Sequence, residues 1–250
     1  MIEPAERAAR TSKPHTGEPL PHESAKLHVT GEALYTDDIG APADALHAYV
    51  GLSQATHARI KHLNLDAVRK ARGVVCVLTA SDIPGSSDIG PVYEGDPLIA
   101  SDTVEFRGQI LFAVAAVSNK AARRAARLAE IEYEMLPAIL DSQTGHERES
   151  YVRPMHCQRR GDAETAIAEA PMKLEGAFQS GGQEQMYLEG QASLAIPDED
   201  GKMLVYSSTQ HPSEGQKLVA EVLNIPLSHV TVQVRRMGGA FGGKETNANQ

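Results

Sequence analysis

Three consecutive patterns between residues 110 and 135 restrict the fold more than any other feature of the sequence. "ILFAVAAVS" (110–118) is almost wholly apolar, which predicts a buried strand. In "NKAARRAARLAE" (119–130) small apolar residues recur at spacings of three and four, which predicts a helix with one buried face and an arginine-rich outer face. "IEYEM" (131–135) alternates apolar and acidic residues, as a half-exposed strand does. Strand, helix and strand with mixed burial indicate an α+β domain.

Two further strands are expected upstream, over 46–53 and 73–80. The second, "GVVCVLTA", is nearly continuous in apolar residues, so we expect it to be buried on both faces, with Cys76 as a small buried thiol. A short helix is predicted between the two strands and ends at Gly73, because glycine readily takes the backbone conformation that terminates helices.

The chain divides into four parts by composition. We predict a flexible arm over 1–21, a folded domain over 22–141, a linker over 142–161 and a second, incomplete domain over 162–250. The arm is rich in charge, proline and small residues, and the linker is polar and has neither helical nor strand periodicity. Asp162 is well placed to cap a short helix at the start of the second domain.

The second domain contains signals for three strands and a helix. Strands are predicted over 191–197 and 202–208, separated by the turn sequence "DEDG". A helix is predicted over 212–224, with Pro212 in its first turn and an apolar stripe along one side. "HVTVQVRR" (229–236) alternates strictly and leads the chain into a glycine-rich loop.

Composition excludes several classes of function. The net charge of −9 and the lack of any basic stripe argue against nucleic-acid binding, and the absence of tryptophan leaves little to stack on bases. Cys76 and Cys157 form no closely spaced pair, so neither a disulfide framework nor an iron–sulfur cluster is expected in this chain. With no apolar stretch long enough to span a membrane and no export signal, we expect a cytoplasmic protein without membrane association.

The glycine-rich loop is "RRMGGAFGGKE" (235–245), in which Gly238 through Lys244 satisfy G-x-x-x-x-G-K. This spacing is that of the phosphate-binding loop of nucleotide hydrolases, but Glu245 stands where those proteins have a serine or threonine that binds Mg²⁺. A carboxylate next to a triphosphate is unfavourable, so a nucleotide hydrolase is only an outside candidate. A plain turn or another cofactor loop remains open from these residues alone.

Segments spread along the chain resemble, in order, the molybdenum-binding subunit of the xanthine dehydrogenase family of molybdenum hydroxylases. They are "LPHESAKLHVTGEALYTDDI" (20–39), "FRGQILFAVAAVSNKAARRAARLAEIEYEMLPAILD" (106–141), "GGQEQMYLEG" (181–190), "SSTQHPS" (207–213) and "RRMGGAFGGKE" (235–245). The resemblance implies an α/β hammerhead domain followed by the first part of a molybdopterin-binding α+β domain. The family subunit runs several hundred residues further, so it also implies an N-terminal piece without the catalytic base, inactive alone.

The resemblance further implies a role for five residues. A pterin dithiolene holds the molybdenum in this family, and the side-chain amide of Gln183 is expected to hydrogen-bond a molybdenum oxo group. The backbone amide of Phe241 is expected near the metal, and Gly239 and Gly242 let the chain pass close to the cofactor. Glu245 matches the glutamate that binds a purine substrate. Lys244 is given no role and is expected to be a solvated charge.

The resemblance also implies partners and a reaction. Hypoxanthine or xanthine would be hydroxylated to urate with oxygen from water, and electrons would pass to a partner subunit carrying 2Fe–2S clusters and FAD, then to NAD⁺. A heterotetramer is expected. Gln185 departs from the family, which usually has histidine there, and this departure bears on purine specificity. A non-catalytic domain that docks a partner is the alternative function.

Overall fold

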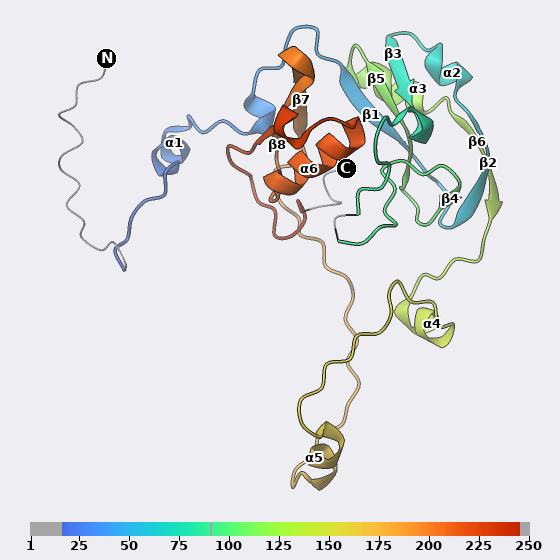
Figure 1. Cartoon of the computed structure of the whole chain (residues 1–250), viewed down its shortest axis with the longest axis vertical. Coiled ribbons are helices and arrows are strands. Elements are labelled where there is room, and N and C mark those ends of the chain that lie inside the picture. Colours follow the sequence, from blue (N-terminus) through green and yellow to red (C-terminus); the bar gives the residue numbers. More distant parts are fainter. Residues whose placement is uncertain (1–16, 91, 246–250) are drawn as a thin grey trace.

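The computed structural model describes residues 17–90 and 92–245, which contain three small sheets (Figure 1). The strands of the first part are β1 (His47–Leu52), β2 (Ala58–Asn64), β3 (Val74–Leu78), β4 (Thr103–Val104), β5 (Ile110–Ala116) and β6 (Glu130–Met135). Its helices are α1 (Ala25–Thr30), α2 (Asp66–Arg69) and α3 (Asn119–Ala126), with 3-10 turns η2 (Thr36–Asp38) and η3 (Ala80–Asp82). The predicted α+β class is confirmed.

The first part packs two antiparallel sheets around one core. Their strand orders are β1-β5-β3 and β4-β2-β6, and α3 lies against β1 and β5. Ala122 and Ala125 of α3 are buried while Arg123 and Arg124 are exposed, as the spacing predicted. The buried apolar cluster consists of Leu65, Val68, Ala100, Val104, Leu111, Phe112, Val114, Ala116, Ala122 and Ala125. Strand β5, predicted to be buried, runs through the middle of this core.

Strand β3 was predicted to be buried on both faces, and this prediction is wrong. The strand lies at the edge of its sheet, paired only with β5, and Val75 is 57% exposed. Cys76 is exposed as well, so the expectation of a buried thiol is also wrong. An apolar run does not reveal whether a strand lies at the centre or the edge of a sheet, because this depends on partners far away in the sequence.

The second part contains one sheet and three helices. Its strands are β7 (Ser193–Asp198), β8 (Lys202–Ser207) and β9 (Val230–Gln233). Its helices are α4 (Ser142–Glu147), α5 (Ala163–Glu169) and α6 (Pro212–Leu223), with 3-10 turns η4 (Glu199–Gly201) and η5 (Leu227–His229). Among the residues that the structure describes, no helix combines the length and the apolarity needed to cross a membrane.

The sheet of the second part is a hairpin extended by a parallel strand. Strands β7 and β8 are antiparallel across the predicted turn, and β8 pairs with β9 in parallel. Helix α6 connects these two parallel strands, begins at Pro212 as predicted and ends at Asn224, whose positive φ of 53° closes its last turn. Parallel pairing makes β8 and β9 end at the same edge of the sheet.

Before the sheet of the second part begins, residues 137–190 run away from the body of the molecule and return (Figure 1). Helix α4 lies in the segment that we predicted to be an aperiodic linker, and Asp141 caps it by accepting a hydrogen bond from the Thr144 amide at 2.8 Å. The Asp162 carboxylate caps α5 through the Thr165 amide at 3.1 Å, as predicted. The boundaries of the arm and the linker stay predictions, and residues 1–16 of the arm lie outside the described residues.

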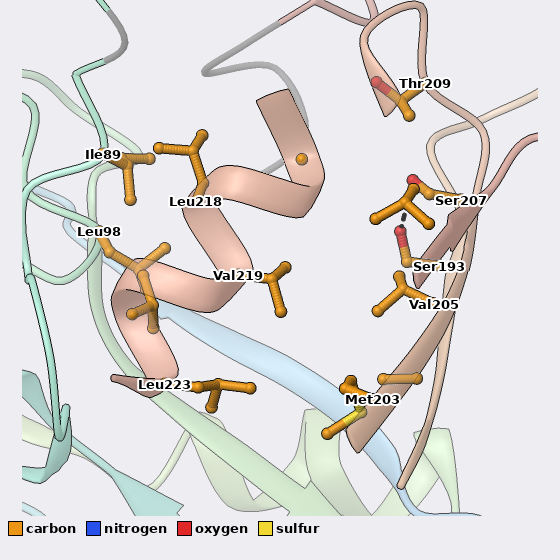
Figure 2. Close-up of a pocket in the computed structure, with 14 residues that line it drawn as sticks. Ile89, Leu98, Ser193, Met203, Val205, Ser207, Thr209, Leu218, Val219 and Leu223 are labelled. Carbon is orange, nitrogen blue, oxygen red and sulfur yellow. Dashed lines mark hydrogen bonds between the residues drawn. The ribbon is translucent and has the colours of Figure 1, made fainter. Parts of the chain in front are cut away.

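The two parts meet at the end of α6. The amides of Gly85 and Ser86 donate to the carbonyl oxygens of Val222 and Glu221, each at 3.0 Å. Beside this contact, α6 and the β7–β8 hairpin line an apolar cavity of about 420 Å³. Ile89 and Leu98 line it too, and in Figure 2 they lie on the side of α6 away from the strand that carries Val205 and Met203. The first part of the chain therefore supplies part of the wall of this cavity.

Candidate functional site

The glycine loop (residues 238–243) follows β9 and has an unusual backbone. Gly239 and Gly242 have φ of 95° and 89°, and Phe241 between them has φ of 56°. Residues other than glycine rarely adopt a positive φ, so the backbone favours glycine at positions 239 and 242. The Phe241 side chain is 75% exposed, which leaves its ring outside the packed core.

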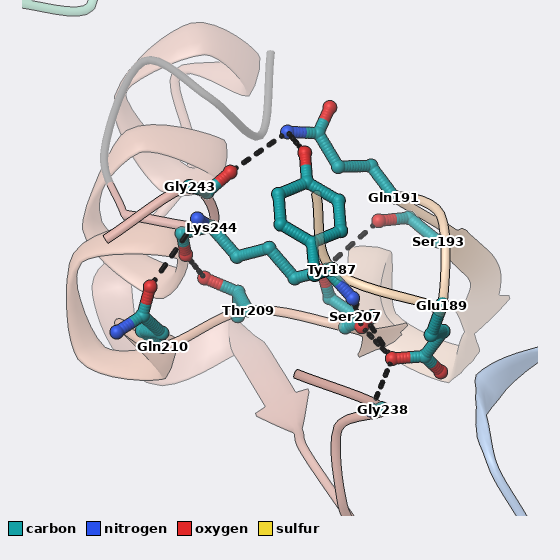
Figure 3. Close-up of polar contacts among 11 residues, drawn as sticks. Tyr187, Glu189, Gln191, Ser193, Ser207, Thr209, Gln210, Gly238, Gly243 and Lys244 are labelled. Atoms are coloured by element: carbon teal, nitrogen blue, oxygen red, sulfur yellow. Dashed lines mark hydrogen bonds and ion pairs between the residues drawn. The ribbon is translucent and has the colours of Figure 1, made fainter. Parts of the chain in front are cut away.

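Glu189 is the residue on which the loop is anchored (Figure 3). Its Oε2 atom accepts hydrogen bonds from Lys244 Nζ at 2.8 Å, from Ser208 Oγ at 2.5 Å and from the Gly238 amide at 2.8 Å. A side chain on Gly238 would place its Cβ 2.6 Å from the Cβ of Glu189, so only glycine permits this approach. The carboxylate thus joins the loop to the segment 181–190 that precedes β7.

Lys244 was expected to be a solvated charge, and the structure corrects this. Its side chain is fully buried, and its Nζ atom donates to Ser208 Oγ at 2.6 Å as well as to Glu189. The ammonium lies 4.9 Å from the centre of the Tyr187 ring, within the range of a cation–π interaction. The physical reason is that a lysine can be buried where a carboxylate, a hydroxyl and a ring face surround its ammonium.

The charge of Glu189 follows from these contacts. Burial alone would raise the pKa of the Glu189 carboxyl, but hydrogen bonds from Lys244, Ser208 and the Gly238 amide outweigh burial and lower the pKa below its usual value. Glu189 is therefore ionised at neutral pH, and the pair is a buried salt bridge.

Neighbouring segments fix the backbone of the loop. The Gln210 side-chain oxygen accepts hydrogen bonds from the backbone amides of Gly242 at 3.0 Å and Lys244 at 3.3 Å. The backbone amide of Gln210 donates to the Lys244 carbonyl at 2.8 Å. The Gln191 side-chain amide donates to the Gly243 carbonyl at 3.1 Å. Both ends of the loop are thus bonded to segments that flank β7 and β8 (Figure 3).

The predicted site residues fall into two groups. Gly239, Phe241 and Gly242 share the loop, and Glu245 follows it after Lys244 and is exposed. Gln183 lies on the exposed segment before β7, where its side-chain amide donates to the neighbouring Gly182 carbonyl at 3.3 Å and to no other described residue. Glu189 connects the two groups, since it belongs to the segment of Gln183 and binds the loop.

The described residues fit a cofactor that brings its own metal ligands. Residues 17–90 and 92–245 contain no group of three histidine, cysteine, aspartate or glutamate side chains that could hold a metal ion. Across the same residues, the amides of Gly239, Ala240 and Phe241 donate no hydrogen bond to another described group. Successive amides at a turn with positive φ form a concavity suited to an anionic or oxo-bearing group.

Sequence reasoning missed Lys244, Ser208 and Gln210. Lys244 and Glu189 are 55 positions apart, and only the folded chain shows that they meet. The residues next to Lys244 in the sequence, Gly243 and Glu245, give no signal of its burial.

Two domain families match the chain. Residues 30–137 match the aldehyde oxidase and xanthine dehydrogenase a/b hammerhead domain, and residues 144–250 match the molybdopterin cofactor-binding domain. Xanthine dehydrogenase of Dictyostelium discoideum is 38% identical over 231 residues, which are 92% of this chain and 17% of that protein. Xanthine dehydrogenase of Oryza sativa subsp. japonica is 39% identical over 236 residues, 93% of this chain and 17% of that protein. The chain thus spans about a sixth of these relatives' length.

Solved structures share the fold. The aldehyde oxidoreductase from Desulfovibrio gigas matches with a TM-score of 0.77 at 24% identity, over 90% of this chain and 27% of that one. Quinoline 2-oxidoreductase from Pseudomonas putida 86 matches with a TM-score of 0.76 at 24% identity, over 90% of this chain and 31% of that one.

Proposed function

Because the chain belongs to the xanthine dehydrogenase family of molybdenum hydroxylases, we propose that it supplies the oxo-facing and substrate-facing loops of a molybdenum centre that hydroxylates a purine. Hypoxanthine and xanthine are the proposed substrates, urate the product and water the source of oxygen. The observation that carries this proposal is the glycine loop, in which the amides of Gly239, Ala240 and Phe241 donate to no described group. The loop binds Glu189, in the segment of Gln183, through Gly238 and is followed by Lys244 and the exposed Glu245.

The cofactor would be held by backbone and amide groups. Gly239, Phe241 and Gly242 offer amides or close backbone approach, and Gln183 offers a side-chain amide that can donate to an oxo oxygen. Molybdenum bound through a pterin dithiolene supplies the two-electron redox chemistry of such a centre. The chain's own contribution is to orient the cofactor through hydrogen bonds, which agrees with the absence of a metal-ligating cluster among the described residues.

Glu245 would bind the substrate. A carboxylate accepts a hydrogen bond from a ring N–H, or takes a proton from the ring during turnover. Glu245 is exposed, whereas the preceding residue, Lys244, is buried. Lys244 would thus have a structural role, whereas the charge of Glu245 would be accessible to substrate.

Electrons would leave through a partner subunit. We propose that a partner with 2Fe–2S clusters and FAD passes them to NAD⁺, within a heterotetramer in the cytoplasm. The two exposed cysteines, Cys76 and Cys157, form no cluster site with other described residues, so electron carriers are expected elsewhere.

A nucleotide hydrolase agrees poorly with the geometry. The lysine of a phosphate-binding loop must reach a phosphate, but the Lys244 ammonium donates to Glu189 and Ser208. A partner-docking domain without cofactor is the remaining alternative, favoured by the almost fully exposed segment 171–186.

Metal analysis of the purified protein tests the proposal. Stoichiometric molybdenum supports the hydroxylase, and its absence after production in a cell that makes the cofactor supports the docking domain. Mg²⁺-dependent ATP binding would instead revive the nucleotide hydrolase. Xanthine turnover by the assembled enzyme then decides the substrate.

A further inference from the structure

We propose that Glu189 and Lys244 are positioning residues, which clamp the glycine loop onto the segment before β7 and so set the direction in which Glu245 leaves the loop. The clamp itself is independent of any substrate. Its consequence for purine binding rests on the proposed function of Glu245.

The clamp is made of two buried charges. Lys244 is fully buried and the Glu189 side chain is 11% exposed, and their contact measures 2.8 Å. Buried ion pairs are weak sources of stability, because desolvation offsets their attraction, and apolar pairs of the same size often replace them without loss. What an ion pair adds is a specific geometry, since a carboxylate binds its donors only in defined directions.

The geometry of this pair selects one arrangement of the loop. One oxygen of Glu189 binds the side chain at the end of the loop and also the amide of Gly238 at its beginning. The loop is therefore closed through a single atom, Oε2. The other oxygen, Oε1, is buried and has no hydrogen-bond partner among the described residues, so Oε2 alone carries the contacts to Lys244, Gly238 and Ser208.

The clamp acts on Glu245 through the backbone. Both backbone polar groups of Lys244 are bonded, the amide to Gln210 and the carbonyl to Thr209 Oγ1 at 3.0 Å. The side chain and the backbone of Lys244 are therefore both held by hydrogen bonds. They fix the direction in which the chain continues to Glu245. In this arrangement Lys244 is buried and Glu245 is exposed.

Three variants separate positioning from mere stabilisation: Glu189→Gln, Lys244→Met and the double variant that removes both charges. The matched control is Lys217→Met with Glu221→Gln, an exposed pair on α6 whose contact measures 3.7 Å. We measure thermal unfolding and amide hydrogen exchange of the 250-residue chain, and KM and kcat for xanthine in the enzyme that contains it.

Each single variant leaves one buried charge without its partner, and we expect Tm to fall by roughly 6–20 °C. The double variant should recover most of that loss. Exchange of the hydrogen-bonded amides of Gly238, Gly242, Gly243 and Lys244 should nevertheless remain at least about tenfold faster than in the wild type, because the loop has lost its closing contact. KM for xanthine should stay raised by roughly tenfold or more in the double variant, with a smaller change in kcat.

Recovery of Tm, exchange and KM together in the double variant would show that the pair only stabilises, and the proposal would be wrong. An exchange rate equal to that of the control pair would overturn it in the same way. The exchange measurement needs neither cofactor nor purine. If the wild-type enzyme fails to oxidise xanthine, the proposed function is wrong while exchange still decides the clamp.

Discussion

The amide nitrogen of Gly85 lies 3.0 Å from the carbonyl oxygen of Val222, and this contact joins a loop of the first part of the chain to the last turn of α6. A Cβ atom on Gly85 would lie 1.9 Å from the carbonyl oxygen of Glu221, which is too close for any side chain. The two parts of the chain therefore depend on the smallness of one residue for their contact.

Gly85→Ala should accordingly destabilise the chain, by about 1–3 kcal/mol, because the backbone of the loop or of α6 must shift to admit the methyl group. Urea unfolding measures the free energy. Gly40→Ala is the control, because a Cβ at Gly40 meets no atom within 4 Å. Equal stability of the two variants would show that the contact between the parts is loose.

Replacing Glu245 by glutamine should impair purine turnover in the complete enzyme and leave molybdenum in place. The change keeps the volume of the side chain but removes its charge, and losing a hydrogen bond to a charged group costs about 1.5–3 kcal/mol, or roughly one to two decades in a rate constant. Steady-state kinetics and molybdenum per protein are measured together. Turnover at the wild-type rate would refute the substrate role.

Gly242→Val should have the opposite effect and lower the molybdenum content. The φ of Gly242 is 89°, which a β-branched residue cannot adopt without strain, so the loop must change its shape. Gly176→Val serves as the control, since Gly176 has open space around it and no positive φ. If both variants retain full molybdenum, the loop does not hold the cofactor.

Acid should weaken the contact between Glu189 and Lys244 only at low pH. Because the pKa of Glu189 is lowered in the folded chain, its ionised form contributes stability that is fully present above the carboxyl's ordinary pKa of about 4.3. That contribution is lost as pH falls through the lowered pKa. Unfolding free energy measured between neutral and acidic pH should therefore fall less in Glu189→Gln than in the wild type; parallel curves would contradict this.

Proteases should cut the chain first between Gly145 and Gly161. Residues 146–161 are all exposed, and beyond α4 they form no helix or strand, so the backbone can enter a protease without unfolding the core. Limited digestion with mass spectrometry locates the cuts. First cuts within 110–135 would mean that the domain boundary is misplaced.

Much of the fold follows from local patterns. Helix α6 begins at Pro212 and strand β9 alternates its valines, and both signals are contained within a few residues. Strand β2 was missed because a register shift between Ile60 and His62 interrupts its alternation. The predicted burial of β3 was wrong because β3 lies at the edge of its sheet, and an edge position depends on which strands pair.

Only part of the candidate site could be predicted from the sequence. The glycine loop and Glu245 could be singled out because their chemistry is local to one segment. The burial of Lys244 could not be predicted, because its partner Glu189 reaches it only after the hairpin and α6 have folded between them. Long-range electrostatic partners are a property of the packed chain and leave little periodic trace in the sequence.

Strands β8 and β9 run in parallel, so the segments after them, which hold Gln210 and the glycine loop, leave the sheet on the same side. The two segments therefore form one platform that is carried by the sheet, and Thr209 in the first of them also lines the apolar cavity. An exposed residue beside this platform, such as Glu245, can therefore be exchanged while the cavity wall and the sheet stay as they are. The buried Lys244 cannot, so tolerance to substitution changes between two neighbouring positions of the chain.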